Sequence, residues 1–299
     1  MTSMIEKLFT FFSIICGAII IFLPSSAIIF LLYHGWHVIN PVLLFGETPW
    51  RDVIFLKAPI YNGIGNAVVG TFFLIINASL LAIPIGIISG IFLSQSSHLS
   101  PHKLNKLNMI RKILSIYVDI LSSIPSIIMG LFGLMLILTL RKTFVPNANT
   151  CMFLSSFCLA LLVLPYIIRS TEGALNSLPE KFKLLGPALG MNKLESARYI
   201  LLPLASRGIL SGIILSIGRI AEDTAVIMLT GAIANTGLSG GIFDNFEALP
   251  FSIFYLATNY SNQNELDNAF GAAIILLGIT TLTFVLARAI QKRLEIRWK

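Results

Sequence analysis

Residues 66–93 read NAVVGTFFLIINASLLAIPIGIISGIFL, a stretch without a single charged side chain. At 1.5 Å per helical residue it is long enough to cross the roughly 30 Å of hydrocarbon in a bilayer. Similar apolar stretches recur along the 299 residues, of which 56% are hydrophobic and only 12% charged. An ordinary soluble domain has about 25% charged residues. The sequence therefore predicts an all-α integral membrane protein and excludes a soluble enzyme, a disordered chain and a disulfide-stapled secreted module.

The six predicted spans cover residues 8–32, 66–93, 120–140, 151–169, 205–230 and 268–289. The first is too long for the apolar region of a signal peptide, about 7 to 15 residues, and no small-residue cleavage site follows it. We therefore expect a retained anchor, with Pro24 as a candidate kink. An amphipathic stretch, Lys103 to Ser123, predicts a helix that lies in the membrane interface before the chain turns inward near Pro125.

The basic residues of the loops predict the orientation, because cytoplasmic loops carry an excess of Lys and Arg. With the N-terminus in the cytoplasm, sixteen basic residues fall in inner segments, and the four in outer segments are Arg51, Lys57, Arg141 and Lys142. Both termini are therefore predicted to be cytoplasmic, and topology explains the net charge of +7 without nucleic-acid binding. The chain then divides into an N-terminal helix with an external segment (1–64), a helical core (65–290) that includes the inner loop 179–203, and a basic cytoplasmic tail (291–299).

Motifs of nucleotide, metal and disulfide chemistry are missing from the sequence. It contains no G-x-x-x-x-G-K-[ST] phosphate loop, no H-E-x-x-H and no C-x-x-C. The three cysteines, Cys16, Cys151 and Cys158, lie in apolar segments without metal-ligand spacing, and we expect buried free thiols. The sequence therefore predicts no catalytic residue, metal or cofactor on this chain.

The long inner loop between spans four and five has helix start and stop signals. Pro179 opens a helix that Gly190 is placed to end. Asn192 with Glu195 three residues later forms a variant of the capping box, and the second helix is predicted to stop at Pro203. The result is a cytoplasmic helix-turn-helix, which is either a docking element for a partner or a plain surface hairpin.

Three charged residues, Arg219, Glu222 and Asp223, lie inside the predicted fifth span, where burying them without partners costs several kcal/mol. Their spacings of three and four place them on one helical face. They form either the wall of a polar path through the bundle or a self-neutralising cluster that only fixes helix packing. Arg169 and Glu172, also three apart, lie at the inner end of the fourth span, where the orientation alone already favours a basic residue.

Two pairs of glycines, Gly86 with Gly90 and Gly208 with Gly212, have the spacing that lets membrane helices approach closely. Glycine is also an ordinary residue of membrane helices. A specific helix contact and an incidental spacing are therefore both open for each pair.

The inner loop resembles that of the membrane subunits of six-helix ABC importers, which has the form E-A-A-x-x-x-G-x9-I-x-L-P. The residues that fit this spacing or cap the second helix are Gly190, Asn192, Ile200, Leu202 and Pro203. The first part of the motif differs in this chain, where Leu184-Leu185-Gly186 stands in place of Glu-Ala-Ala. Pro187 follows directly and is expected to strain the first helix. The resemblance implies a type I ABC importer permease fold with a cytoplasmic coupling helix-turn-helix, in which these residues couple to an ATPase.

Within that superfamily, residues 60–290 are similar to phosphate-specific permeases, the A-type membrane subunits of Pst importers. The stretches that carry the likeness are 123–134 (SIPSIIMGLFGL), 164–172 (LPYIIRSTE), 217–225 (IGRIAEDTA) and 248–255 (ALPFSIFY). In the third stretch Glu222 stands where the family has glycine and Asp223 where it has glutamate, so this chain has an additional acid. An extra anion beside a phosphate path is unfavourable by Coulomb's law.

The resemblance implies a bacterial inner-membrane importer of inorganic phosphate. This chain would pair with a C-type permease, two copies of a cytoplasmic ATPase would hold ATP and Mg²⁺, and an extracytoplasmic phosphate-binding protein would deliver the substrate. The residues of the substrate path would be Arg219, Arg169, Glu222 and Asp223. The alternatives are an importer of another oxyanion (sulfate, molybdate or phosphonate), an anion transporter driven by ion gradients, and a sensory scaffold.

Overall fold

The computed structural model describes residues 2–46, 63–94, 106–234, 236–237 and 240–296. Within these ranges every regular element is a helix, and one isolated parallel bridge joins Ala232 to Phe246. Six of the helices are long and apolar enough to cross a membrane. The prediction of an all-α protein with six spanning helices is therefore confirmed.

The long apolar helices are α1 (Thr2–Gly35), α4 (Gly65–Ser94), α6 (Ser126–Thr143), α7 (Met152–Asn176), α10 (Leu202–Glu222) and α13 (Gln263–Ile296). The other helical elements are η1 (Trp36–Val38), α2 (Pro41–Phe45), α5 (Lys106–Ser123), α8 (Glu180–Ala188), α9 (Lys193–Ser196), the π-helical turn η3 (Ala197–Leu201), α11 (Ala225–Thr230) and α12 (Leu249–Asn259). The break between α5 and α6 falls at Ile124 and Pro125, because a residue before proline is disfavoured in a helix. It lies where the amphipathic stretch was predicted to end.

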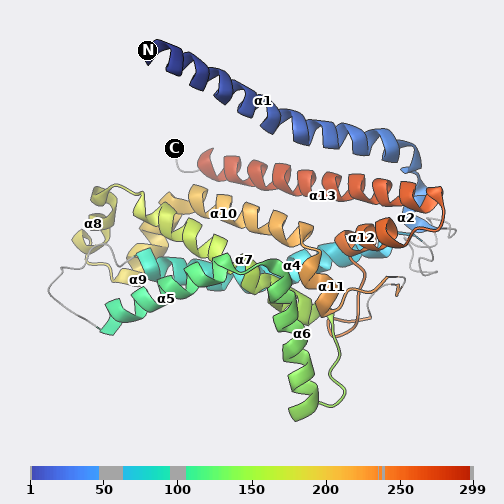
Figure 1. Cartoon of the computed structure of the whole chain (residues 1–299). Coiled ribbons are helices and arrows are strands. Elements are labelled where there is room, and N and C mark those ends of the chain that lie inside the picture. Colours follow the sequence, from blue (N-terminus) through green and yellow to red (C-terminus); the bar gives the residue numbers. More distant parts are fainter. Residues whose placement is uncertain (1, 47–62, 95–105, 235, 238–239, 297–299) are drawn as a thin grey trace.

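α7 is the central helix, and α4 and α10 both pack against it (Figure 1). The two glycine pairs make these close approaches, because a Cβ at Gly86 would lie 2.6 Å from the Ile167 side chain. The α7 residues that such a Cβ would meet are Ile167 and Thr171 for Gly86 and Gly90, and Ala174 and Ser170 for Gly208 and Gly212. Both pairs are therefore specific helix contacts, and together they fix α7 between its two neighbours.

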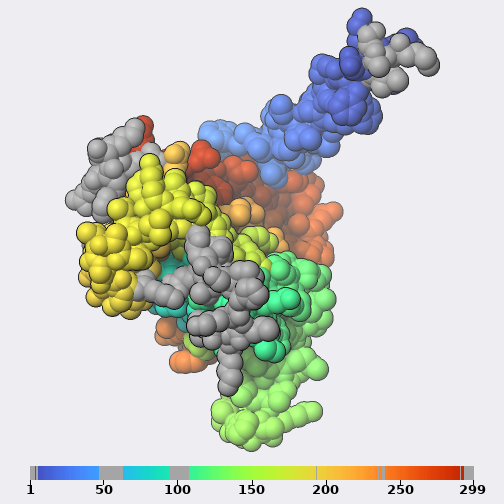
Figure 2. All heavy atoms as spheres, turned by 90° about the vertical axis from the view of Figure 1, so that its left-hand side faces the viewer, coloured from blue at the N-terminus to red at the C-terminus, as the bar shows by residue number. Residues whose placement is uncertain are grey.

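The remaining long helices surround this centre unevenly. α13 lies beside α10, α1 lies beyond α13, and α6 leaves the body at a steep angle (Figure 1). The C-terminal end of α1 packs on the beginning of α13, where a Cβ at Gly35 would lie 2.8 Å from the Phe270 backbone. Seen from the end that carries α8 and α9, α1 protrudes on one side of the molecule and α6 on the other (Figure 2). Both therefore offer long apolar surfaces to lipid or to another chain.

The two ends of the bundle are built differently. The start of α1, the end of α13 and the α8–α9 hairpin lie at one end, and α2 and α12 lie at the other (Figure 1). At the second end the first N–H groups of α7 are bound by the chain that follows α11. Met152 donates to the Asp244 carbonyl at 3.0 Å, and Phe153 donates to that of Ile242 at 2.8 Å. These bonds satisfy helix-terminal donors that would otherwise lack partners.

Candidate functional site

The fifth span is interrupted at Asp223, between the end of α10 and the start of α11. The Asp223 backbone is extended, and its Oδ1 accepts a hydrogen bond from the Val226 N–H at 2.9 Å. A short polar side chain that binds nearby backbone groups competes with helical hydrogen bonding. This competition explains why the prediction of one continuous helix over 205–230 was wrong.

Arg219 and Asp223 form an ion pair, with 3.6 Å between Nη2 and Oδ2. The Asp223 side chain is 2% exposed and that of Arg219 is 42% exposed. Glu222 lies on the exposed surface, and its side chain has no hydrogen bond or ion pair with any other residue that the structure describes. Around the helix axis Arg219 lies between the two acids, so the three residues fall on one side of α10, with Arg219 and Glu222 exposed and Asp223 buried.

The glycine contacts also set the depth of this pair. Gly208 meets Ala174 and Gly212 meets Ser170, so α10 and α7 are antiparallel in a defined register. If the same pairing continues toward the C-terminal end of α10, Arg219 lies level with the middle of the 25-residue helix α7. The charged pair therefore lies at mid-depth of the bundle, where a charge without a partner is costly.

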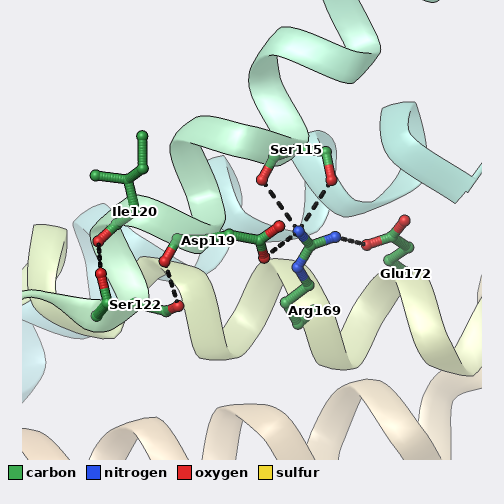
Figure 3. Close-up of polar contacts among 7 residues, drawn as sticks. Ser115, Asp119, Ile120, Ser122, Arg169 and Glu172 are labelled. Carbon is green, nitrogen blue, oxygen red and sulfur yellow. Dashed lines mark hydrogen bonds and ion pairs between the residues drawn. The ribbon is translucent and has the colours of Figure 1, made fainter.

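Arg169 belongs to a separate cluster that joins α5 to α7 (Figure 3). Its Nη1 donates to Glu172 Oε2 at 2.6 Å. Its Nη2 donates to the Ser115 carbonyl at 3.0 Å and the Ser115 hydroxyl at 2.9 Å, and it pairs with the Asp119 carboxylate. The structure does not bring Arg169 together with Arg219, because in the register of α10 and α7 they lie about 9 Å apart along the helix axis.

The Arg169 guanidinium therefore ties two helices together by charge-assisted hydrogen bonds in a planar fork. Two carboxylates, Asp119 and Glu172, surround this one positive charge. An incoming anion would have to compete with both of them. The predicted place of Arg169 on the substrate path stays a prediction, and its geometry fits a structural tie better.

The α8–α9 hairpin is the predicted helix-turn-helix. α8 begins directly after Pro179, and Gly190 has φ +72°, the left-handed conformation that follows many helix ends. The Asn192 N–H donates to Glu195 Oε2 at 2.8 Å, and the Glu195 N–H donates to Asn192 Oδ1 at 2.9 Å. The capping box is therefore confirmed.

The helix after the hairpin does not stop at Pro203. α9 passes through the π-helical turn Ala197–Leu201 directly into α10, so Ile200, Leu202 and Pro203 all lie on one helical connection. A π-helical turn shifts the hydrogen-bond pattern by one residue, which accommodates a proline that has no N–H. The predicted end at Pro203 was wrong, and the hairpin is joined to the charged span by a continuous helix.

Two functional candidates were missed from the sequence. Gly186 packs so closely on α9 that a Cβ there would overlap the Ser196 side chain, and its departure from the Glu-Ala-Ala pattern was the available signal. The other is Glu247, which lies between α11 and α12; its side chain is buried, and its Oε1 accepts a hydrogen bond from the Gly237 N–H at 2.7 Å. Burial raises the pKa of the Glu247 carboxyl, and the backbone hydrogen bonds from Gly237 and Thr236 partly offset this.

Comparison with known proteins places this fold and these motifs in a family. The sequence profile of the binding-protein-dependent transport system inner membrane components matches residues 82–297. The phosphate transport system permease protein PstA of Haemophilus influenzae is 33% identical over 235 residues, covering 77% of this chain and 78% of its own length. The PstA of Yersinia pestis is 32% identical over 230 residues, covering 77% of this chain and 72% of its own.

The fold has solved relatives as well. A chain of the MetNI methionine ABC transporter, solved in inward-facing conformations, matches with a TM-score of 0.61 at 17% identity, over 77% of this chain and 95% of that one. The predicted type I ABC importer permease fold is thereby confirmed. The family profile covers more than two thirds of the sequence and includes the hairpin and the charged span. This chain belongs to the family of binding-protein-dependent transport system inner membrane components.

Proposed function

We propose that this chain is a membrane-spanning permease subunit of an ATP-driven ABC importer that carries inorganic phosphate into the cytoplasm. The similarity to phosphate transport permeases over about three quarters of the chain carries the proposal. The Arg219–Asp223 pair supports it, because a partly exposed guanidinium at mid-depth offers a positive group to an oxyanion in a low-dielectric setting. Arg219 and Asp223 then contact the path, and Glu222 lies beside it.

The α8–α9 hairpin is the docking element for the ATPase in this proposal. It exposes apolar side chains at the end of the bundle, which are Leu184, Leu185, Leu189, Leu194 and Tyr199. An apolar patch of this kind on a cytoplasmic hairpin favours a protein contact. Two copies of the ATPase hold ATP and Mg²⁺, and this chain binds no cofactor. Because α9, η3 and α10 form one continuous helix, a tilt of the hairpin moves Arg219 directly.

The remaining partners follow from the two ends of the molecule. The hairpin end, with both termini, faces the cytoplasm of a bacterial inner membrane, in agreement with the excess of Lys and Arg in the inner segments. The end with α2 and α12 receives an extracytoplasmic phosphate-binding protein. A C-type permease chain completes the path as the second half of a heterodimer.

The test is the initial rate of labelled phosphate uptake in cells with and without this chain, in the presence of excess sulfate, molybdate or phosphonate. We expect a phosphate-selective component that disappears without the chain and persists when the ion gradients are collapsed while ATP is maintained. Competition by another oxyanion would move the proposal to that substrate. Unchanged uptake, in cells shown to contain all the partner subunits, would refute the assignment to phosphate.

A further inference from the structure

A cavity of about 340 Å³ lies at the end of the bundle opposite the hairpin. Its walls come from α2, from α12, from the beginning of α13 and from the chain between α11 and α12, at the end that the charge pattern predicts to be extracytoplasmic (Figure 1). Its volume lies within the range of about 300 to 1,000 Å³ that is usual for sites of small molecules. Neither Arg219 nor Asp223 lines it, so the cavity is separate from the proposed substrate path.

The polar part of the wall contains a buried carboxylate. Glu247 is 7% exposed, and its partners among the described residues are backbone N–H groups, of which that of Gly237 donates to Oε1 at 2.7 Å. The described residues of the wall include no lysine, arginine or histidine, so this carboxylate has no basic partner there. The other polar side chains of the wall are amides and hydroxyls, and they are Asn40, Ser252, Tyr255 and Asn268. A buried carboxylate without a counter-charge favours a cationic ligand, because burying a lone charge is costly.

The rest of the wall is largely apolar and includes Val42, Leu43 and Leu256. This composition argues against a bare metal ion, because Ca²⁺ and Mg²⁺ surround themselves with about six or more oxygen atoms. In the part of the chain that the structure describes, no group of three or more His, Cys, Asp or Glu residues is placed to hold a metal. An organic cation uses both kinds of wall, since its charged group pairs with the carboxylate and its carbon chain covers apolar surface. Tyr255 adds an aromatic ring to the wall, and aromatic faces attract cations.

We propose that this cavity is a binding site for a small organic cation with a single ammonium group, an alkylammonium, which pairs with Glu247. The alkyl part lies against the apolar wall formed by Val42, Leu43 and Leu256. The ammonium group neutralises the carboxylate and donates hydrogen bonds to it and to the neighbouring amide and hydroxyl oxygens. The site does not depend on which anion is transported, so the inference goes beyond the proposed function.

The test is isothermal titration calorimetry of the purified complete importer with n-butylammonium at constant ionic strength. We expect saturable binding of n-butylammonium and no saturable binding of n-butanol, which has the same chain length and no charge. From methylammonium to n-butylammonium the affinity should rise by up to about fourfold for each added methylene, because each one buries more apolar surface. Mg²⁺ and Na⁺ should not displace the amine at equal ionic strength.

Two substitutions assign the binding to this cavity. Glu247→Gln keeps the size of the side chain and removes its charge, and we expect the affinity for n-butylammonium to fall about tenfold or more. Asp244→Asn is the matched control, because Asp244 is an exposed acid of the same segment that does not line the cavity, and it should leave the affinity unchanged.

Four results would overturn the proposal: no saturable binding of n-butylammonium, binding of n-butanol as tight as that of the amine, displacement of the amine by Mg²⁺ or Na⁺, or unchanged affinity in Glu247→Gln. The comparison of amine with alcohol uses the unaltered protein, so it decides the matter even where the variant does not assemble. Phosphate uptake enters none of these measurements, so a failure of the phosphate assignment is seen separately.

Discussion

At the scale of single residues, Arg219 is the group on which the proposed path depends. Replacing it with alanine removes the positive group at mid-depth but touches no helix contact, so we expect uptake to fall to background while the complex still assembles. Asp223 keeps its hydrogen bond to the Val226 N–H in this variant, which preserves the start of α11. Uptake of labelled phosphate and recovery of the partner subunits are measured together, with Lys142→Ala on an exposed helix end as the control. Normal uptake with Arg219→Ala would remove the role assigned to it.

Glu247 gives a pH dependence whose sign follows from its burial. Its pKa is raised in the folded protein, so the folded state binds this proton more tightly than the unfolded state does. The carboxyl therefore adds stability at low pH, and this contribution is lost as the pH rises through the folded pKa. We expect Glu247→Gln, which cannot ionise, to flatten that part of the dependence of Tm on pH. Parallel Tm curves for the variant and the parent complex would contradict the prediction.

The residue scale also shows what a sequence can and cannot predict. The Asn192–Glu195 capping box and the Arg219–Asp223 pair were predictable because each is set by a spacing of three or four along one helix. The partners of Arg169 on α5 were not, because Ser115 lies 54 positions earlier in the chain. Which residue meets which across helices depends on packing, and no local pattern encodes it.

At the scale of elements, the four glycines of α4 and α10 that pack against α7 have a measurable cost of substitution. Gly86→Ala places a methyl group against Ile167, and overpacking of this kind costs about 1–3 kcal/mol. Gly173→Ala is the matched control, because its Cβ would meet nothing within 4 Å, and alanine is the better helix former by about 1 kcal/mol. Thermal unfolding of the two purified variants should move in opposite directions or at least differ clearly. Equal Tm values would mean that α4 and α7 adjust without strain.

Helix existence and helix ends were predictable to different degrees. All six apolar spans were predicted, because a run of about twenty apolar residues is the length that crosses a bilayer and is uncommon in other structures. The fifth was divided at Asp223 and the hairpin helix ran on through Pro203, and both deviations depend on hydrogen bonding that residue types alone do not specify. The continuous stretch through Pro203 lies between the hairpin and Arg219, and the break at Asp223 lies four residues beyond Arg219.

At the scale of the whole molecule, the helices define two ends of the bundle, and the pattern of basic residues predicts which end is cytoplasmic. The hairpin, the start of α1 and the end of α13 lie at one end, and α12 lies at the other. An even number of spanning helices, six, brings the start of α1 and the end of α13 to the same side. The excess of basic residues in the inner segments is the physical reason to place the hairpin end in the cytoplasm, because positively charged loops are translocated poorly. The two ends of the bundle are thus observed in the structure, and their placement in the cytoplasm or outside it is predicted from the charge pattern.

Single cysteines at the two ends test this orientation directly. In a chain whose three native cysteines are replaced by serine, Leu189→Cys on the exposed hairpin should react with a membrane-impermeant maleimide only in inverted vesicles. Tyr260→Cys, exposed between α12 and α13, should react only in intact spheroplasts. Phe144→Cys, after α6, reports a second outer loop and should follow Tyr260→Cys because an odd number of spans precedes both positions. The reverse pattern at all three positions would place the hairpin outside the cell, where no ATPase has access to ATP, and the ATP-driven import proposed for this chain would fall with it.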